Sequence, residues 1–252
     1  MVRVIMHGCN GVMGQVITGM AKDMEGLTIV AGIDLKNDKE NGYPVYASLE
    51  ECKEEADVVV DFASPKAADH LMDFCAEKKL GLVLCTTGLS EEQIKKVKET
   101  AEKTAVLRSA NMSLGVNLLL KLVQEAAKVL ANSGFDIEIV EKHHNQKKDA
   151  PSGTALALAE SMNEALGNQY HYVYDRSSVH EKRDPKEIGI ASVRGGSIVG
   201  DHDVIFAGKD EVITFNHTAY SKAIFAKGAL EAAKFLAGKE PGLYDMSDVV
   251  QL

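Results

Sequence analysis

Three evenly spaced glycines near the N-terminus constrain the fold more than any other feature of this sequence. Gly8, Gly11 and Gly14 follow a short apolar run, residues 2–6, and precede a helical pattern of apolar residues that continues to Met24. Glycines at a strand-to-helix turn permit a tight turn, a close approach of the backbone to a pyrophosphate and close packing of the helix on the strand. The pattern predicts the first strand, turn and helix of a dinucleotide-binding domain. A glycine-rich turn without a ligand is the alternative.

The residue after the second predicted strand supports a nucleotide site. Residues 27–33 are predicted to form this strand, and Asp34 follows it, 20 residues after Gly14. A carboxylate at about this distance binds the ribose hydroxyls in such domains, whereas a 2′-phosphate needs an arginine or lysine. The next residues are Leu35 and Lys36, and Lys36 can partly offset the charge of Asp34. We predict NADH use, and NADPH use stays open.

Strands and helices continue to alternate up to about residue 112. Apolar runs predict three further strands, at residues 56–62, 80–85 and 105–108. A helix is expected at 65–78, and Ser90-Glu-Glu-Gln93 has the pattern of a capping box before another helix. This alternation predicts an α/β fold with a Rossmann-like, doubly wound parallel sheet. Because ligands bind beyond the carboxyl ends of such strands, the loops that follow them are expected to converge on one site.

The pattern changes after residue 112. An apolar helix is predicted at 114–131, and strand-like alternation then appears at 136–141, 170–174, 188–193, 203–207 and 211–217, with one clear helix at 153–166. We therefore predict a dinucleotide-binding domain at 1–112 and a second, α+β domain at 113–221 with a mixed or antiparallel sheet. The last helix, 222–236, is expected to return to the first domain, which residues 222–252 would complete.

The segment from Glu141 to Thr154, Glu-Lys-His-His-Asn-Gln-Lys-Lys-Asp-Ala-Pro-Ser-Gly-Thr, has the densest concentration of reactive side chains. Two histidines and a lysine precede a helix start for which Asp149 or Ser152 is the candidate cap. The free N–H groups and the dipole at a helix N-terminus favour an anion. Histidine is a natural proton source near neutral pH, and lysine can bind a carboxylate or deliver a proton. The segment predicts an anion site beside proton donors; a basic surface loop before an ordinary helix is the alternative.

The adjacent histidines, His143 and His144, are not expected to bind a metal. Neighbouring residues of a strand point to opposite faces, and no ligand set with suitable spacing lies nearby. For the same reason the chain must leave the extended conformation at about His143 if both rings are to face one substrate. The other six histidines are expected to be structural or exposed. The glycine-rich segment 194–202 could edge a site, but a bulge or a turn is the favoured interpretation.

Composition limits the partners and the compartment. The net charge of −9 argues against non-specific nucleic-acid binding and makes a local positive cluster stand out as a site for an anion. We find no signal-peptide pattern and no apolar segment of membrane-spanning length. The four cysteines form no CxxC pair and have no metal-like spacing, so reduced thiols in the cytoplasm are expected.

Several segments together resemble one known family. Residues 141–154 are similar to the signature of the 4-hydroxy-tetrahydrodipicolinate reductase family, also called dihydrodipicolinate reductase. The resemblance extends over nearly the whole chain, to residues 8–14, 61–62, 86–88, 110–117, 192–202 and 242–249. It implies an NAD(P)H-dependent reductase that converts the cyclic product of aspartate-semialdehyde and pyruvate condensation to tetrahydrodipicolinate, in diaminopimelate and lysine synthesis. It also implies a homotetramer assembled through the sheet of the second domain.

The resemblance also implies roles for single residues. His143 matches a proton donor and acceptor, and Lys147 matches a proton donor. The positions that match contacts to the substrate carboxylates are His144, Gly153 and Thr154. The positions that match coenzyme contacts are Gly8, Cys9, Asn10, Gly11, Val12, Met13, Asp34, Cys85, Thr86, Thr87, Ser109, Ala110, Asn111, Met112, Lys222 and Phe225.

Four positions depart from the family pattern and bear on coenzyme choice. Val12, Leu35 and Lys222 stand where the family often has arginine, and Met112 stands where it often has phenylalanine. They argue against a strong preference for NADPH. Two rival interpretations are a nicotinamide dehydrogenase for a smaller amino or imino acid and a non-catalytic NAD(P)-sensing protein. In the first, dipicolinate would not bind; in the second, changing His143 or Lys147 to alanine would leave function intact.

Overall fold

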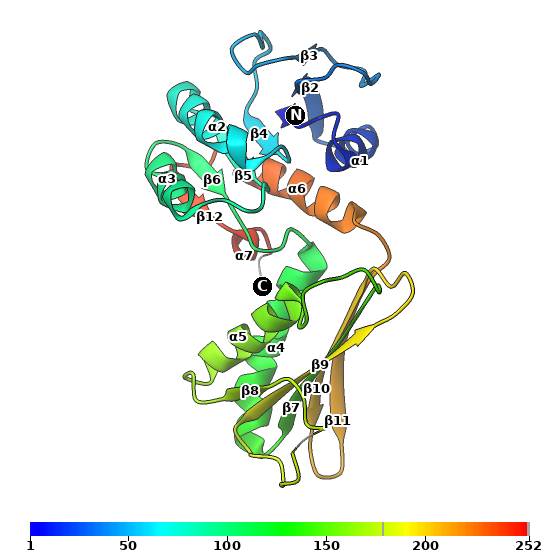
Figure 1. Ribbon diagram of the computed structural model, residues 1–252. Helices are drawn as coiled ribbons and strands as arrows, with labels where there is room; N and C mark the ends of the chain where they lie inside the picture. Colours follow the sequence, from blue (N-terminus) through cyan, green and yellow to red (C-terminus); the bar gives the residue numbers. More distant parts are fainter. Residues whose placement is uncertain (178, 251–252) are drawn as a thin grey trace. The chain divides into compact units, whose positions relative to one another are not determined.

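The computed structural model describes residues 1–177 and 179–250, which form two compact units (Figure 1). Unit 1 comprises Met1–Leu114 and the C-terminal segment from Ala223, and unit 2 comprises Gly115–Lys222. The unit boundaries therefore lie after Leu114 and Lys222, whereas the sequence pattern had placed them after residues 112 and 221. Lys222 belongs to unit 2 and not to the segment that completes unit 1.

Unit 1 is built on a parallel sheet of seven strands. They are β1 (Val2–His7), β2 (Leu27–Ile33), β3 (Val45–Tyr46), β4 (Val58–Asp61), β5 (Gly81–Leu84), β6 (Ala105–Leu107) and β12 (Gly242–Tyr244). Their order is β12-β6-β5-β4-β1-β2-β3, and every pair is parallel. The chain moves outward from β1 in one direction through β2 and β3 and in the other through β4, β5 and β6. This switch point confirms the predicted Rossmann-like sheet.

Helices cover both faces of this sheet (Figure 1). Alternate strand residues such as Val4 and Ile5 belong to two different apolar clusters, because successive side chains of a strand point to opposite faces. One cluster holds α1 (Val12–Ala21), α6 (Ala223–Leu236) and α7 (Met246–Val249), and the other holds α2 (Pro65–Lys78) and α3 (Glu91–Ala101). The return of the last long helix to this unit is therefore confirmed.

Local sequence signals explain where these helices begin. Pro65 opens α2, and the predicted capping box of α3 is present: the Ser90 Oγ accepts from the Gln93 N–H at 3.2 Å, and the Gln93 Oε1 accepts from the Ser90 N–H at 3.0 Å. Each bond satisfies a backbone or side-chain group that a bare helix end leaves free. The strands β3 and β12 were not predicted, because these short segments show neither an apolar run nor an alternation that stands out from the neighbouring residues.

Unit 2 contains a mixed sheet of five strands. They are β7 (Asp136–His143), β8 (His171–Val173), β9 (Glu187–Arg194), β10 (Gly200–Ala207) and β11 (Val212–Ala219), in the order β11-β10-β7-β9-β8. β10 is antiparallel to β7 and β11, whereas β7, β8 and β9 are parallel to one another. The second, mixed sheet is thus confirmed. A hairpin turn joins β10 to β11, where the Gly208 N–H donates to the Glu211 carbonyl at 2.8 Å.

Two helices, α4 (Leu114–Leu130) and α5 (Gly153–Ala165), pack on one face of this sheet, and a 3-10 turn (Ala131–Ser133) follows α4. Burial alternates strictly along β7 and β10, so Ile137, Ile139, Val204 and Phe206 enter one apolar core. The opposite face carries polar pairs such as Lys142 with Asp201 at 2.7 Å. Among residues 1–177 and 179–250, no helix is long and apolar enough to cross a membrane.

Candidate active site

The glycine loop of unit 1 forms a cradle of backbone groups. Gly8 has a φ of +79°, and a β-carbon there would lie 2.9 Å from the Phe62 carbonyl oxygen. A β-carbon on Gly14 would lie 2.2 Å from the Gly8 carbonyl oxygen, so only glycine allows α1 to approach the loop this closely. Gly11 caps α1 without a side-chain bond. The first turn of the helix therefore presents backbone N–H groups that suit a pyrophosphate.

A cavity of about 380 Å³ lies beside this cradle. Its lining includes Gly8, Gly11, Asp34 and Leu35. Asp34 stands directly after β2, and its Oδ2 accepts from the Asn10 N–H at 3.0 Å while its Oδ1 accepts from the Lys36 N–H at 3.2 Å. These bonds fix the carboxylate at the cavity wall. Leu35 is 91% exposed and brings no positive charge to the position where a 2′-phosphate would need one.

The other predicted coenzyme residues occupy loops at the carboxyl ends of neighbouring strands. Cys85, Thr86 and Thr87 follow β5, and residues 109–112 follow β6. The Thr86 hydroxyl is buried and has no hydrogen-bond partner within the described part of the chain, as expected for a group that awaits a ligand. None of these residues lines the cavity that contains Asp34. The structure thus brings Gly8, Gly11 and Asp34 to one cavity and leaves the other loops at the adjoining strand ends.

The structure places three of the predicted coenzyme positions, Cys9, Phe225 and Lys222, in different surroundings. Cys9 is fully buried, and its thiol packs against Gly32, so only its backbone can face a ligand. Burial is also the main reason that the pKa of the Cys9 thiol is raised to about 11. Phe225 lies in the first turn of α6 in unit 1, whereas Lys222 is the last residue of unit 2.

In unit 2, His143 is the last residue of β7, and its ring is 8% exposed. The chain leaves the extended conformation directly afterwards: the Lys147 N–H donates to the His144 carbonyl at 3.1 Å, and the Asn145 N–H donates to the Gly196 carbonyl at 3.2 Å. The strand therefore ends where the paired histidines required it to end. His144 stands in the turn and is partly exposed, so it is not held to the face opposite His143 by a continuing strand.

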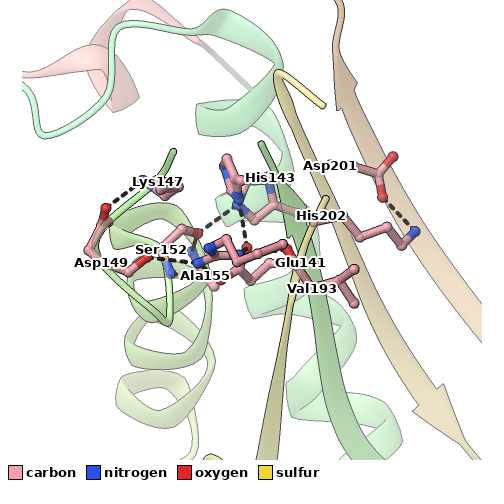
Figure 2. A network of polar contacts seen from close by, with 11 residues as sticks. Glu141, His143, Lys147, Asp149, Ser152, Ala155, Val193, Asp201 and His202 are labelled. Atoms are coloured by element: carbon pink, nitrogen blue, oxygen red, sulfur yellow. Dashed lines mark hydrogen bonds and ion pairs between the residues drawn. The ribbon is translucent and has the colours of Figure 1, made fainter. Parts of the chain in front are cut away.

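The turn leads into the N-terminus of α5 (Figure 2). The Lys147 Nζ lies 2.9 Å from the Asp149 Oδ1 and lowers the pKa of that carboxyl. Ser152, and not Asp149, caps the helix, because its Oγ accepts from the Ala155 N–H at 3.2 Å. Gly153 is the first helical residue and is exposed. Two predicted catalytic side chains and a helix N-terminus therefore share one short loop, next to the predicted carboxylate contacts.

Beneath this loop lies a buried polar network that the sequence pattern did not predict (Figure 2). Glu141 is 0% exposed and pairs with Arg194, the last residue of β9, through bonds of 2.6 and 2.7 Å. Burial alone would raise the pKa of Glu141, but hydrogen bonds from Arg194, Ser192 and His143 outweigh it and lower the pKa to about 2. Residues 195–199 form the predicted turn between β9 and β10, and Arg194, at the end of β9, anchors the buried carboxylate.

His202 completes the network. It stands on β10, its Nε2 lies 2.9 Å from the Ser152 Oγ, and its ring packs edge-on against His143 with centroids 5.1 Å apart. Burial, reinforced by the charge of His143, lowers the pKa of His202 to about 4, so the ring is neutral near pH 7. A structural or exposed position was the prediction for this histidine. Its only sequence signal is the alternation of β10, which places it on the buried face.

Unit 1 contains a second buried pair that was not predicted. The Nδ1 of His7 lies 2.7 Å from the Oδ1 of Asp61, across the neighbouring ends of β1 and β4, and His7 lines the cavity beside the glycine loop. Within residues 1–177 and 179–250, no group of three or more histidine, cysteine, aspartate or glutamate side chains could hold a metal ion.

Two models of one family match the chain in sequence. The model described as dihydrodipicolinate reductase, N-terminus, matches residues 2–112, and that described as dihydrodipicolinate reductase, C-terminus, matches residues 115–250. The chain belongs to the dihydrodipicolinate reductase family. It is an NAD(P)H-dependent oxidoreductase, as members of that family are. The resemblance drawn from the signature segment and the enzyme class that it implied are confirmed.

Individual members of the dihydrodipicolinate reductase family match over their full length. A 4-hydroxy-tetrahydrodipicolinate reductase of Caldanaerobacter subterraneus subsp. tengcongensis is 56% identical, over 100% of this chain and 99% of the relative. One from Clostridium tetani is 48% identical, over 98% of this chain and 96% of the relative. Among solved structures, a dipicolinate-bound dihydrodipicolinate reductase from Paenisporosarcina sp. TG-14 is 26% identical with a TM-score of 0.83, over 98% of this chain and 99% of that one.

Proposed function

We propose that this enzyme reduces 4-hydroxy-tetrahydrodipicolinate, the cyclic product of aspartate-semialdehyde and pyruvate condensation, to tetrahydrodipicolinate. The substrate gains one hydride and one proton and loses its 4-hydroxyl group as water. The reaction is a step of diaminopimelate and lysine synthesis. Family membership and the names of relatives that align over the full chain support it. The observation that carries the proposal is the loop between β7 and α5, where His143, His144 and Lys147 stand directly before a helix N-terminus. This loop can bind an anionic substrate at the helix N-terminus and supply it with a proton.

We propose the residue roles that the family resemblance implies, and this arrangement supports them. His144, Gly153 and Thr154 bind the carboxylates of the substrate, helped by the positive end of the α5 dipole. His143 donates and accepts a proton, and Lys147 donates a proton to the carbon or nitrogen that becomes electron-rich. The dipicolinate bound to the Paenisporosarcina protein is a flat dicarboxylate of related shape, which supports this substrate class.

The coenzyme residues of unit 1 hold a reduced nicotinamide dinucleotide, which supplies the hydride. The cradle at Gly8, Gly11 and Gly14 fits a pyrophosphate, and Asp34 fits the ribose hydroxyls. Asp34 and the uncharged Leu35 favour NADH, while Lys36 permits NADPH, so we propose that the enzyme uses both.

We also propose a cytoplasmic homotetramer that assembles through the sheet of unit 2. Helices cover one face of that sheet, while its other face presents half-buried Val140 and Ile205 and exposed Val193. The four cysteines are free thiols, which suits a reducing compartment. Sedimentation of the wild-type enzyme and of Val193→Asp tests the assembly: a fourfold mass that falls in the variant supports it, and a monomeric wild type contradicts it.

A coupled assay tests the reaction. The condensation product is generated in place from aspartate-semialdehyde and pyruvate, and oxidation of NADH and NADPH is followed in parallel. We expect oxidation that depends on the condensation product with both coenzymes, and competitive inhibition by dipicolinate. If the rate of coenzyme oxidation does not depend on the condensation product, or if dipicolinate does not inhibit the enzyme, a dehydrogenase for a smaller imino acid is favoured.

A further inference from the structure

The buried carboxylate of Glu141 has no role in the proton transfers described above. It lies on the same face of β7 as His143, two residues away. Arg194, Ser152 and Ser192 donate hydrogen bonds to it, and His143 contacts it. Its Oε1 accepts from the Arg194 Nη2 at 2.6 Å and from the Ser152 N–H at 3.1 Å. Its Oε2 accepts from the Arg194 Nη1 at 2.7 Å and lies 2.6 Å from the His143 Nδ1 (Figure 2).

This geometry determines which nitrogen of His143 carries a proton. The paired guanidinium keeps Glu141 ionised, and an ionised carboxylate can accept a hydrogen bond but has no proton to donate. The contact of 2.6 Å therefore requires an N–H at the Nδ1 of His143. In the neutral ring this leaves Nε2 as the nitrogen with a free lone pair.

The residues around the Nε2 atom of His143 leave space beside it and hold the ring in place. A β-carbon on Gly200 would lie 3.1 Å from this atom, so the glycine leaves space that any larger residue would fill. His202 packs edge-on against the ring at an interplanar angle of 74° and limits its rotation. The ring is therefore held by a carboxylate at one nitrogen, while space is kept beside the other.

We propose that Glu141, clamped by Arg194 and Ser152, is the positioning residue of His143: it orients the ring and keeps a proton on Nδ1, so that Nε2 exchanges the proton with the substrate. This inference rests on the proposed role of His143 in the reaction. When the imidazolium donates, the Nε2–H bond breaks, the proton passes to the substrate, and the ring is left neutral with its remaining proton on Nδ1. When the ring accepts, the same bond forms again.

The tautomer can be read directly by NMR. Long-range 1H–15N correlation spectra of the enzyme labelled with 15N-histidine separate a protonated ring nitrogen from an unprotonated one. The His143→Gln variant assigns the signal, because only that ring disappears. We expect the neutral ring of His143 in the wild-type enzyme to carry its proton on Nδ1. This measurement needs no folded variant of Glu141.

The Glu141→Gln variant should reverse the tautomer. Two donors, the Arg194 Nη2 and the Ser152 N–H, face Oε1, whereas the Arg194 Nη1 is the one fixed donor that faces Oε2 beside His143. We therefore expect the amide oxygen of glutamine to take the position of Oε1, and the amide NH2 to take that of Oε2 with loss of the Nη1 bond. The NH2 then donates to the Nδ1 of His143, and the ring proton moves to Nε2. Glu138→Gln is the matched control, because Glu138 also stands on β7 and also pairs with an arginine, Arg183, at 2.9 Å on the opposite face.

Kinetics separate positioning from folding. Glu141→Gln should lower kcat by about 100-fold or more, as the loss of a correctly protonated histidine does, with the KM for NADH within about twofold. Combining it with His143→Gln should add nothing further, and Glu138→Gln should match the wild type. A neutral wild-type ring protonated on Nε2 overturns the proposal, and so does a Glu141→Gln variant with wild-type kcat when His143→Gln is impaired. If His143→Gln itself keeps wild-type kcat, the catalytic role of His143 fails, and the positioning proposal fails with it whatever the tautomer.

Discussion

Gly228 of α6 lies so close to the carbonyl oxygen of Met112 that an added β-carbon would be 1.6 Å from that oxygen. Both residues belong to unit 1, and Met112 ends the loop of predicted coenzyme contacts after β6. The last long helix therefore contacts the backbone of this loop closely at Gly228. Because the neighbour is backbone and not a flexible side chain, it cannot yield without moving the loop.

We expect Gly228→Ala to lower Tm by about 5 °C or more, since overpacking costs roughly 2 kcal/mol or more, and to raise the KM for NADH. Gly19→Ala is the control, because Gly19 stands in α1 with no atom within 4 Å of its added β-carbon. Alanine is the better helix former by about 1 kcal/mol, so this variant should not lose stability. Thermal denaturation and coenzyme titration measure both effects. Equal stability of the two variants would contradict the close contact.

Coenzyme choice should depend on Leu35. An arginine there would reach a 2′-phosphate, and a charge-assisted hydrogen bond of roughly 1.5–3 kcal/mol corresponds to a gain of about tenfold or more. We expect Leu35→Arg to lower the KM for NADPH by this factor while the KM for NADH changes little. Leu35→Gln, which adds length without charge, should leave the ratio of the KM for NADPH to the KM for NADH unchanged. A Leu35→Arg variant with the wild-type ratio would place the 2′-phosphate elsewhere.

Lys147→Ala should lower kcat by about 100-fold or more, because a positioned proton donor contributes at least this much. NADH binding should persist, since the glycine cradle belongs to unit 1 and Lys147 to unit 2. Lys147→Arg keeps the positive charge but cannot give up its proton, so it should restore substrate affinity and not kcat. Lys148→Ala, at the exposed neighbouring position, is the control and should be nearly unaffected. Loss of NADH binding in Lys147→Ala, measured by fluorescence titration, would make the proposed role wrong.

Stability should depend on pH through His202. Its folded pKa is lowered to about 4, mainly by burial, whereas an unfolded histidine titrates near about 6.5. Between these two pKa values the unfolded chain binds a proton on His202 that the folded chain does not bind. The contribution of neutral His202 to the free energy of unfolding is therefore fully present above about pH 6.5 and decreases as the pH falls towards 4. Lowering the pH from 7 to 5 should reduce the free energy of unfolding by about 2 kcal/mol through this histidine alone.

Denaturation of His202→Gln at both pH values checks this expectation. The variant should be less stable at pH 7 and should lose less on acidification than the wild type. His171→Gln, which replaces an exposed histidine of β8, should retain the wild-type dependence. An acid dependence that is the same in His202→Gln and the wild type would show that another group is responsible.

Much of the scaffold could be predicted because its signals are local. The alternation of apolar runs and helical patterns, the glycines at 8, 11 and 14 and the capping box from Ser90 to Gln93 each depend on residues a few positions apart. Such spacings report directly on which face of a strand or helix is buried and on which backbone groups need a partner. The end of β7 at His143 was predictable for the same reason, since two adjacent rings cannot share a face of a continuous strand.

The roles of His143, Lys147 and the coenzyme residues stay predictions, but the network that holds His143 could not have been predicted at all. Arg194 reaches Glu141 only because β9 pairs with β7 in the register that sets His143 opposite Arg194, and His202 arrives on β10 from the other side. Strand order and register are global properties that no local spacing encodes. Local spacing was enough to predict an α/β region and an α+β region, their periodic cores and a loop of proton donors before a helix. The contact of a buried, arginine-bound carboxylate with the Nδ1 of His143 became evident only in the folded chain, because 53 residues separate Glu141 from Arg194 along the sequence.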